Sequence, residues 1–224
     1  MDLNEPLLRT GHPPHTRNLK IYGLFLSRLL FKALLIAIIF TLSFHLPFPI
    51  GIKYLPRGLH YFSAEFQGRE QKIREILEVL ERYPTGLANV TKEELAEVIY
   101  EEATRHNHDP KFILALIAIE SEFQNWSVSE QGAKGLMQIM PYVAESLAQE
   151  LGIEWSGDQT LFNPYLNIRI GIYYLTQLNK DFNDIRLALV AYNCGPTYIK
   201  GLMERKEGIP LNYYRKFVTA YQNI

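Results

Sequence analysis

The chain has 224 residues, of which 47% are hydrophobic and 12% aromatic, enough for one ordinary domain with a sizeable core. Its single cysteine, Cys194, excludes an intramolecular disulfide framework and a cysteine-rich metal site. The net charge of −1 hides an asymmetry, because residues 1–90 hold 11 Lys and Arg against 7 Asp and Glu, whereas residues 91–224 hold 12 against 17. The acidic larger part argues against a nucleic-acid-binding domain, which would present a basic face.

The first apolar run predicts a membrane anchor. Residues 29–46 contain one charged side chain, Lys32, and as a helix they would be about 27 Å long against roughly 30 Å of hydrocarbon. The basic tail 1–28 precedes the run, so the positive-inside rule leaves this tail in the cytoplasm and the rest outside. A cleaved signal peptide is the alternative, but Pro-Phe-Pro at 47–49 follows in place of a small-x-small cleavage site.

The next segment, 47–90, is predicted to be a juxtamembrane linker that contains an amphipathic helix. Prolines and glycines open it, and residues 69–82 then carry a narrow apolar stripe at helical spacing. This helix would pack on the domain or on a partner. The main domain is predicted to follow at 91–224, opening with a capping box from Thr91 to Glu94 and a helix to about Arg105.

Two histidines, His106 and His108, end this predicted helix and raise the question of a metal site. Their spacing is weak evidence for metal ligands, and solvated loop histidines are the simpler interpretation. Asp109 then acts as an N-cap with Pro110 at the first helical position, which predicts a short apolar helix over 110–124.

Glu120 ends the apolar surface of that helix. Apolar residues precede it at helical spacing and Phe123 follows three positions on, so its carboxyl group should lie on or beside the buried face. Loss of solvation favours the protonated form and can raise a Glu pKa from about 4.3 toward roughly 6–7, which suits a general acid. The alternative is a structural Glu, neutralised by an Arg or capping a loop amide.

Two later segments carry groups that suit a sugar. Gly-Ala-Lys-Gly-Leu-Met-Gln at 132–138 combines glycines, which permit close backbone approach, with the amide of Gln138. Asn163 and Pro164 begin another apolar helix, whose role is architectural. The apolar helix that ends at 191–196 then places an aromatic ring and an amide side by side.

Together the Glu-Ser-x-Phe motif at 120–123, the Gly-Ala-x-Gly-Leu-Met-Gln motif at 132–138 and Ala-Tyr-Asn-x-Gly-Pro at 191–196 resemble the soluble lytic transglycosylase (SLT) domain. The resemblance covers about 91–218 and implies a mainly α, compact helical domain of the goose-type lysozyme-like class with a groove, here preceded by one transmembrane helix. It implies that Glu120 is the catalytic acid and base. The substrate-binding positions that it implies are Ser121, Ser129, Met137, Gln138, Tyr192 and Asn193.

The resemblance also implies a reaction. Glu120 would protonate the glycosidic oxygen between N-acetylmuramic acid and N-acetylglucosamine in peptidoglycan, and a 1,6-anhydro ring would close without water, metal or cofactor. Ordinary glycosidases use two carboxylates, whereas these motifs offer one, with Glu130 in the loop as the alternative second. A lysozyme-like hydrolase and a catalytically silent glycan-binding or scaffold module are the rival functions. The anchor places the enzyme on the outer side of a bacterial cytoplasmic membrane, beside the glycan.

The chain departs from the family pattern near its end. Over 209–218 the usual Glu-Thr is replaced by Tyr213 and Tyr214, and the usual Tyr by Phe217. Val143 and Cys194 replace a threonine and a small residue in the earlier motifs. These departures concern the groove's last wall and leave the acid in place.

Overall fold

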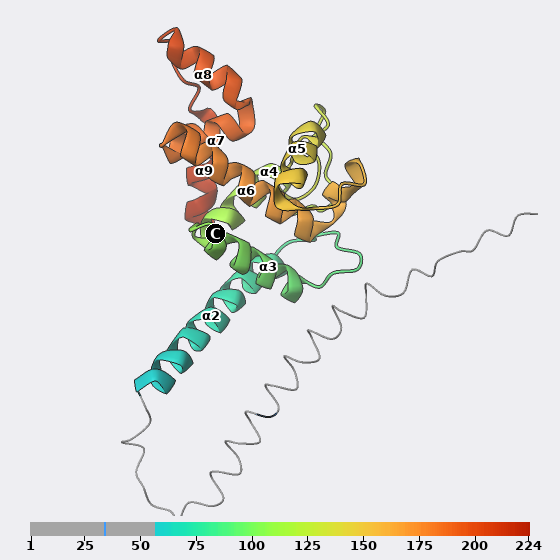
Figure 1. Ribbon diagram of the computed structural model, residues 1–224, viewed down its shortest axis with the longest axis vertical. Helices are drawn as coiled ribbons and strands as arrows, with labels where there is room; N and C mark the ends of the chain where they lie inside the picture. The colour runs from blue at the N-terminus through green and yellow to red at the C-terminus, as the bar shows by residue number, and fades with distance from the viewer. Residues whose placement is uncertain (1–33, 35–56) are drawn as a thin grey trace, which may run out of the picture. The chain divides into compact units, whose positions relative to one another are not determined.

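The computed structural model describes residue 34 and residues 57–224, and residues 59–224 form one compact unit. The helices are α2 (Arg57–Glu81), α3 (Lys92–Arg105), α4 (Pro110–Ser121), α5 (Pro141–Leu151), the short 3-10 helix η2 (Asp158–Phe162), α6 (Pro164–Phe182), α7 (Ile185–Cys194), α8 (Pro196–Glu204) and α9 (Asn212–Asn223). Between residues 57 and 224 the only β-type pairing consists of isolated bridges within one loop. The predicted mainly helical class is confirmed (Figure 1).

The predicted anchor at 29–46 and the tail at 1–28 lie outside the described residues, apart from Leu34. In the part that the structure describes, no helix combines the length and the apolar character needed to cross a bilayer.

Helix α2 is longer than the predicted 69–82, because it already begins at Arg57. Its C-terminal half buries Ile73, Ile76 and Leu80 in the same core as the later helices, whereas its first turns extend away from them (Figure 1). Helix α2 therefore packs on the domain, and the compact unit begins well before residue 91.

The predicted starts of α3 and α4 are confirmed. Thr91 Oγ1 accepts from the Glu94 amide at 3.1 Å, and Glu94 Oε2 accepts from the Thr91 amide at 2.9 Å, which completes the capping box. Asp109 Oδ1 accepts from the Lys111 amide at 3.0 Å, with Pro110 at the first helical position.

Helix α4 lies at the centre of the domain, since its residues from Ile113 to Ile117 are at most 3% exposed. A helix that is apolar on every side must be covered on every side, and α3 and α9 pack directly against it. The helix ends at Ser121, three residues earlier than predicted. Glu122 and Phe123 both adopt left-handed backbone angles, which turns the fully buried Phe123 ring against Tyr83.

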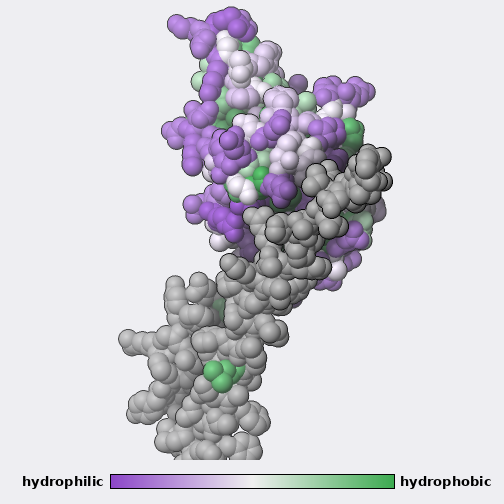
Figure 2. Space-filling model, turned by 45° about the vertical axis from the view of Figure 1, so that its right-hand side comes forward, coloured by the Kyte–Doolittle hydropathy of each residue, from purple (hydrophilic) through white to green (hydrophobic). Residues whose placement is uncertain are grey.

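The remaining helices pack mainly on one another: α6 contacts α3, α5 and α7, and α7 contacts α8 and α9. Asn163 caps α6 as predicted, by accepting from the amides of Tyr165 and Leu166. Helix α7 ends at Gly195, whose φ of 87° is one that a side chain disfavours. On the face shown in Figure 2, hydrophilic residues dominate the coloured surface and hydrophobic ones form small patches.

Candidate active site

The loop between α4 and α5 is held in place by Asn167 of α6, which is completely buried. Its Nδ2 donates to the carbonyls of Lys134 and Leu161 at 3.0 Å, and its Oδ1 accepts from the Met137 amide at 2.8 Å. A Cβ at Gly135 would collide with this Asn167 amide. The side chain of one helix thus fixes the loop that carries the glycine-amide motif.

A hollow of about 370 Å³ opens beside this loop, over the end of α4 and the end of α7. Its lining comprises Glu120, Ser129, Gln131, Ala133, Gln138, Met140, Tyr192 and Asn193. All three predicted motifs therefore contribute to one surface, although Glu120 of the first motif and Tyr192 of the last are 72 positions apart in the sequence. Glu120 is the single carboxylate in this lining.

The pKa of Glu120 is raised to about 7, mainly because burial among apolar neighbours disfavours the charged carboxylate. Two groups act in the opposite direction. The Tyr213 hydroxyl donates to Glu120 Oε1, and the Lys216 ammonium lies close enough to stabilise the anion. The raised pKa expected from the sequence is confirmed, and it leaves a substantial fraction of Glu120 protonated near neutral pH.

The predicted binding residues fall into two groups. Ser129, Gln138, Tyr192 and Asn193 line the hollow with Glu120. Gln138 directs its Nε2 back to the carbonyls of Ser127 and Gly135, at 3.1 and 2.9 Å, so its amide is already oriented by the loop.

Ser121 and Met137 lie behind this surface. Ser121 is buried, and its hydroxyl donates to the Leu136 carbonyl at 2.7 Å, which joins the end of α4 to the loop. Met137 is fully buried, and its carbonyl accepts from the Tyr192 hydroxyl at 2.8 Å. Both residues are therefore buried behind the lining and hold it in position, but neither of them lines the hollow.

Tyr213 is the neighbour of Glu120 that the sequence prediction did not include among the site residues. It lies in the first turn of α9, 93 positions after Glu120, and its pKa is raised well above the usual range by burial and by the nearby carboxyl group. Tyr213 therefore remains a protonated donor. The sequence contained one indication that Tyr213 is special, because the chain departs from the family pattern at this position.

Two nearby carboxylates, Glu122 and the alternative Glu130, do not belong to the hollow. Glu122 is the left-handed residue after α4, and Glu130 lies in the following loop; both are exposed and absent from the lining. Glu120 thus faces the hollow without a second carboxylate among its lining residues.

The two histidines differ from the solvated pair that was predicted, because both are partly buried. His106 packs edge-on against Tyr173, and His108 Nε2 lies 2.9 Å from the Thr176 hydroxyl. Burial lowers the pKa of both rings. Over the described residues, no group of three His, Cys, Asp or Glu side chains is arranged to hold a metal ion.

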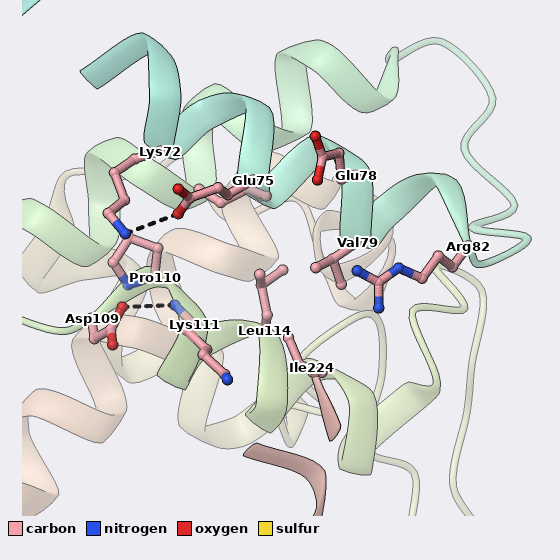
Figure 3. Close-up of a pocket in the computed structure, with 11 residues that line it drawn as sticks. Lys72, Glu75, Glu78, Val79, Arg82, Asp109, Pro110, Lys111, Leu114 and Ile224 are labelled. Atoms are coloured by element: carbon pink, nitrogen blue, oxygen red, sulfur yellow. Dashed lines mark hydrogen bonds and ion pairs between the residues drawn. The ribbon is translucent and has the colours of Figure 1, made fainter. Parts of the chain in front are cut away.

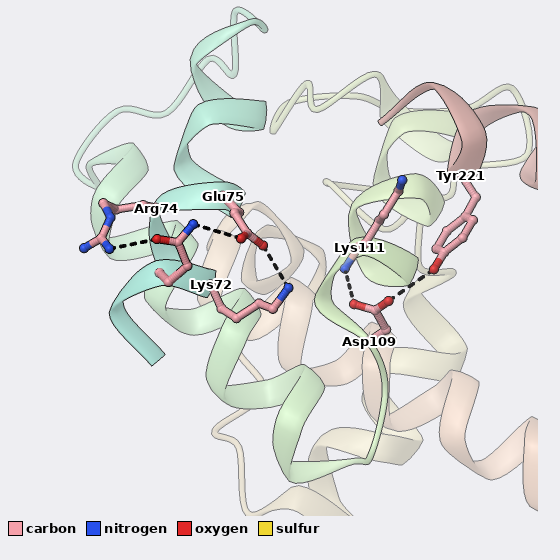
Figure 4. A network of polar contacts seen from close by, with 7 residues as sticks. Lys72, Arg74, Glu75, Asp109, Lys111 and Tyr221 are labelled. Atoms are coloured by element: carbon pink, nitrogen blue, oxygen red, sulfur yellow. Dashed lines mark hydrogen bonds and ion pairs between the residues drawn. The ribbon is translucent and has the colours of Figure 1, made fainter. Parts of the chain in front are cut away.

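Another hollow, of about 230 Å³, lies between α2 and the start of α4 (Figure 3). Some of its polar side chains already have partners: Lys72 pairs with Glu75 at 2.9 Å, and Asp109 accepts from the Tyr221 hydroxyl at 3.1 Å (Figure 4). No residue of the three motifs lines it. The Tyr221 bond attaches α9 to the start of α4, whereas the Lys72–Glu75 pair lies within α2. The candidate active site is therefore the hollow at Glu120.

The sequence profile of the family "Transglycosylase SLT domain" matches residues 97–208, which are 112 of the 224 residues. The chain belongs to this family. The match contains all three motifs, so the predicted family resemblance is confirmed, and Glu120 with its hollow lies inside an SLT domain.

Two curated relatives illustrate the similarity. A protein named "Putative soluble lytic murein transglycosylase" from Haemophilus influenzae is 31% identical over 103 residues, covering 46% of this chain and 17% of its own. A "Membrane-bound lytic murein transglycosylase F" from Desulfosudis oleivorans is 34% identical over 110 residues, covering 46% of this chain and 22% of its own. The chain thus spans about a fifth of the length of these relatives.

Among solved structures, an inactive mutant of the lytic transglycosylase Slt from Pseudomonas aeruginosa is 27% identical. The superposition covers 72% of this chain and 27% of that one, with a TM-score of 0.48.

Proposed function

We propose that this SLT-domain protein is a peptidoglycan lytic transglycosylase with Glu120 as its single acid and base. The observation that carries the proposal is a lone carboxylate, with a pKa raised to about 7, in the lining of a hollow large enough for sugar rings. The relatives named as lytic murein transglycosylases support the substrate class, namely the bond between N-acetylmuramic acid and N-acetylglucosamine.

In the first step, protonated Glu120 donates its proton to the glycosidic oxygen while the bond from that oxygen to the anomeric carbon breaks. The N-acetyl group of the muramoyl sugar stabilises the electron-deficient carbon. The N-acetylglucosamine side leaves as an alcohol, and Glu120 is left as a carboxylate.

In the second step, Glu120 accepts the proton of the muramoyl carbon-six hydroxyl as that oxygen bonds to the anomeric carbon. The product has a 1,6-anhydro end, no water is consumed, and the acid is regenerated. One carboxylate suffices because the attacking group belongs to the substrate itself. Of the proposed binding residues, four would contact the sugars, namely Ser129, Gln138, Tyr192 and Asn193. Ser121 and Met137 would instead hold these four residues in position.

A membrane location completes the proposal. The apolar run 29–46 would anchor the chain, with the basic tail 1–28 in the cytoplasm and the SLT domain on the outer side of the bacterial cytoplasmic membrane. The proposed partners are therefore peptidoglycan strands and the membrane. One relative is itself named membrane-bound, which supports this location.

Digestion of purified sacculi with the full chain, followed by mass spectrometry, tests the reaction. We expect muropeptides one water lighter than hydrolysis products, because the anhydro ring replaces the free reducing end. Glu120→Gln should lower the rate by at least about a hundredfold, since it removes the general acid. Glu122→Gln is the matched control, because that carboxylate is exposed and outside the hollow.

Each rival predicts another result. Products of ordinary mass would indicate a lysozyme-like hydrolase, with water in place of the carbon-six hydroxyl. Binding to sacculi without cleavage by the unmodified chain would indicate a scaffold or binding module. Normal cleavage by the Glu120→Gln variant would show that the acid has been assigned to the wrong residue.

A further inference from the structure

A separate small hollow, of about 170 Å³, lies where three segments meet: the loop before α3, the loop after α4 and the turn into α6. It is lined by Ala88, Asn89, Val90, Asn125, Trp126, Phe162, Asn163 and Pro164. We call it the Trp126 hollow. It shares no lining residue with the hollow at Glu120, so the mechanism above does not use it.

Trp126 is an ordered aromatic side chain on the surface. Its Nε1 donates to the Gly86 carbonyl at 2.7 Å, and its indole stacks on Phe162 with the ring centroids 5.1 Å apart. A Cβ at Gly86 would lie 3.3 Å from the indole, so glycine lets the two segments approach closely. Even so, 56% of Trp126 is exposed. A large aromatic side chain that is fixed yet exposed offers a rigid platform to a ligand.

The polar groups of this hollow are amides. Asn163 caps α6 with its Oδ1, and this bond fixes the orientation of its side-chain amide. The Nδ2 of that amide is a donor that has no acceptor among the described residues. Asn125 is 2% exposed; its Nδ2 donates to the Phe162 carbonyl at 2.9 Å, whereas its buried Oδ1 has no hydrogen-bond partner within residues 57–224. An acceptor left unpaired in the interior destabilises the folded state. Because Oδ1 is buried, a ligand hydroxyl or amide N–H would pair with it only after the Asn125 side chain turned toward the hollow.

The lining also contains no charged side chain. An ionised group of a peptide would lose its hydration in this hollow without gaining an oppositely charged partner. The composition therefore disfavours a charged peptide as the ligand. An aromatic platform with a few directed amides suits a neutral sugar ring, which presents an apolar C–H face and polar hydroxyl and N-acetyl groups.

We propose that the Trp126 hollow is an accessory site for an N-acetylated sugar of a glycan strand, outside the catalytic hollow. The choice of glycan rests on the proposed function. The two hollows lie within reach of one strand, because Trp126 is only three residues from Ser129 of the catalytic hollow, at most about 11 Å along the backbone. The accessory contact would retain the strand between cleavage events.

The test measures binding apart from cleavage, in the full chain carrying Glu120→Gln and held in detergent. Trp126→Ala should bind sacculi about three- to tenfold more weakly, as expected for loss of one aromatic contact. Tyr198→Ala is the matched control, because Tyr198 is 52% exposed but lies on α8 and lines neither hollow. Equal affinities for the Trp126→Ala variant and its parent would overturn the proposal.

A second measurement covers the case in which Trp126→Ala fails to fold. The chain contains two tryptophans, so Trp155→Phe leaves Trp126 as the only indole. Titration with tri-N-acetylchitotriose should change its fluorescence saturably, and Asn163→Ala should weaken that response. No saturable change, or a response only to a stem peptide without sugar, would contradict the proposal. If sugar binds at Trp126 but the unmodified chain cleaves no glycan, the proposed enzyme function would be wrong, whereas the proposed accessory site would be supported.

Discussion

At the scale of single residues, the site depends on how the environment of Glu120 is balanced. Burial at the end of α4 favours the neutral acid, whereas Tyr213 and Lys216 favour the anion, and burial prevails. A group that must donate a proton and then recover it works best when neither state is strongly favoured near the working pH. A pKa of about 7 meets this condition at neutral pH.

The stability of the fold should therefore depend on the charge of Glu120. Its pKa is about 7 in the folded state, against 4.5 for an unperturbed Glu, so the folded state keeps a proton that the unfolded state releases as the pH rises through this window. Stability is thus lost between pH 4.5 and 7. Urea unfolding should show Glu120→Gln to be about 3 kcal/mol more stable than wild type at pH 8, with little difference at pH 4. A Glu122→Gln control should differ little from wild type at either pH.

Removal of the Tyr213 hydroxyl should move the pH dependence of the reaction. Tyr213 donates to Glu120 and stabilises the anion, so Tyr213→Phe should raise the pKa of Glu120 further. The alkaline limb of the kcat/KM profile, where the acid loses its proton, should then shift to higher pH, while kcat falls about tenfold as the carboxyl group loses its anchor. Tyr214→Phe, the neighbour that makes no such bond, is the control. A profile identical to that of wild type would remove Tyr213 from the site.

At the scale of elements, the hollow depends on a loop that has no regular secondary structure. The loop between α4 and α5 is fixed by α6, through Asn167 and through Gly171, where a Cβ would collide with Met137. The predicted architectural role of this helix thus has a physical basis, since it supplies partners for backbone groups that the loop cannot pair internally.

Asn167→Leu should disrupt this support without adding a charge. It would leave the Met137 amide and the Leu161 carbonyl without a partner, which costs about 1–3 kcal/mol for each unsatisfied group, whereas the Lys134 carbonyl would keep its bond from the Ile139 amide. We expect the midpoint of thermal unfolding to fall by about 10 °C or more and glycan cleavage to fall with it. Asn179→Leu, on the same helix but without a side-chain contact to the loop, should behave like wild type. Equal losses in the two variants would refute a specific role for Asn167.

At the scale of the whole molecule, the SLT domain and the beginning of the chain differ in charge and hydropathy. Residues 91–224 carry 12 basic and 17 acidic side chains, whereas the basic excess precedes the apolar run. Helix α2 follows this run and joins the domain core through Ile76 and Leu80. The proposed division is an anchor at 29–46 and a catalytic unit that includes α2.

Charges placed in the apolar run test the anchor. Aspartates at Ile36 and Ile38 should cost about 5 kcal/mol of insertion free energy and release the chain from carbonate-washed membranes. Ile50→Asp, outside the run, should leave it in the membrane fraction. The mass of the purified protein addresses the alternative, because loss of the first residues would indicate a cleaved signal peptide.

The sequence by itself determined much of this protein. The helix starts at Thr91, Asp109 and Asn163 follow from local capping chemistry, and the raised pKa of Glu120 follows from its position on an apolar helix. These features depend on neighbours a few positions apart, which a sequence displays directly. The same is true of the motifs that assigned the family.

Only the tertiary structure decided which groups surround the acid. Tyr213 reaches Glu120 from 93 positions away, Ser121 and Met137 turn inward, and α4 ends early so that Phe123 can enter the core. The Trp126 hollow likewise joins three distant segments. Such pairings depend on how helices distant in the sequence, such as α4 and α9, pack against one another. The fit of whole helix surfaces decides that packing, and a short stretch of sequence does not contain this information.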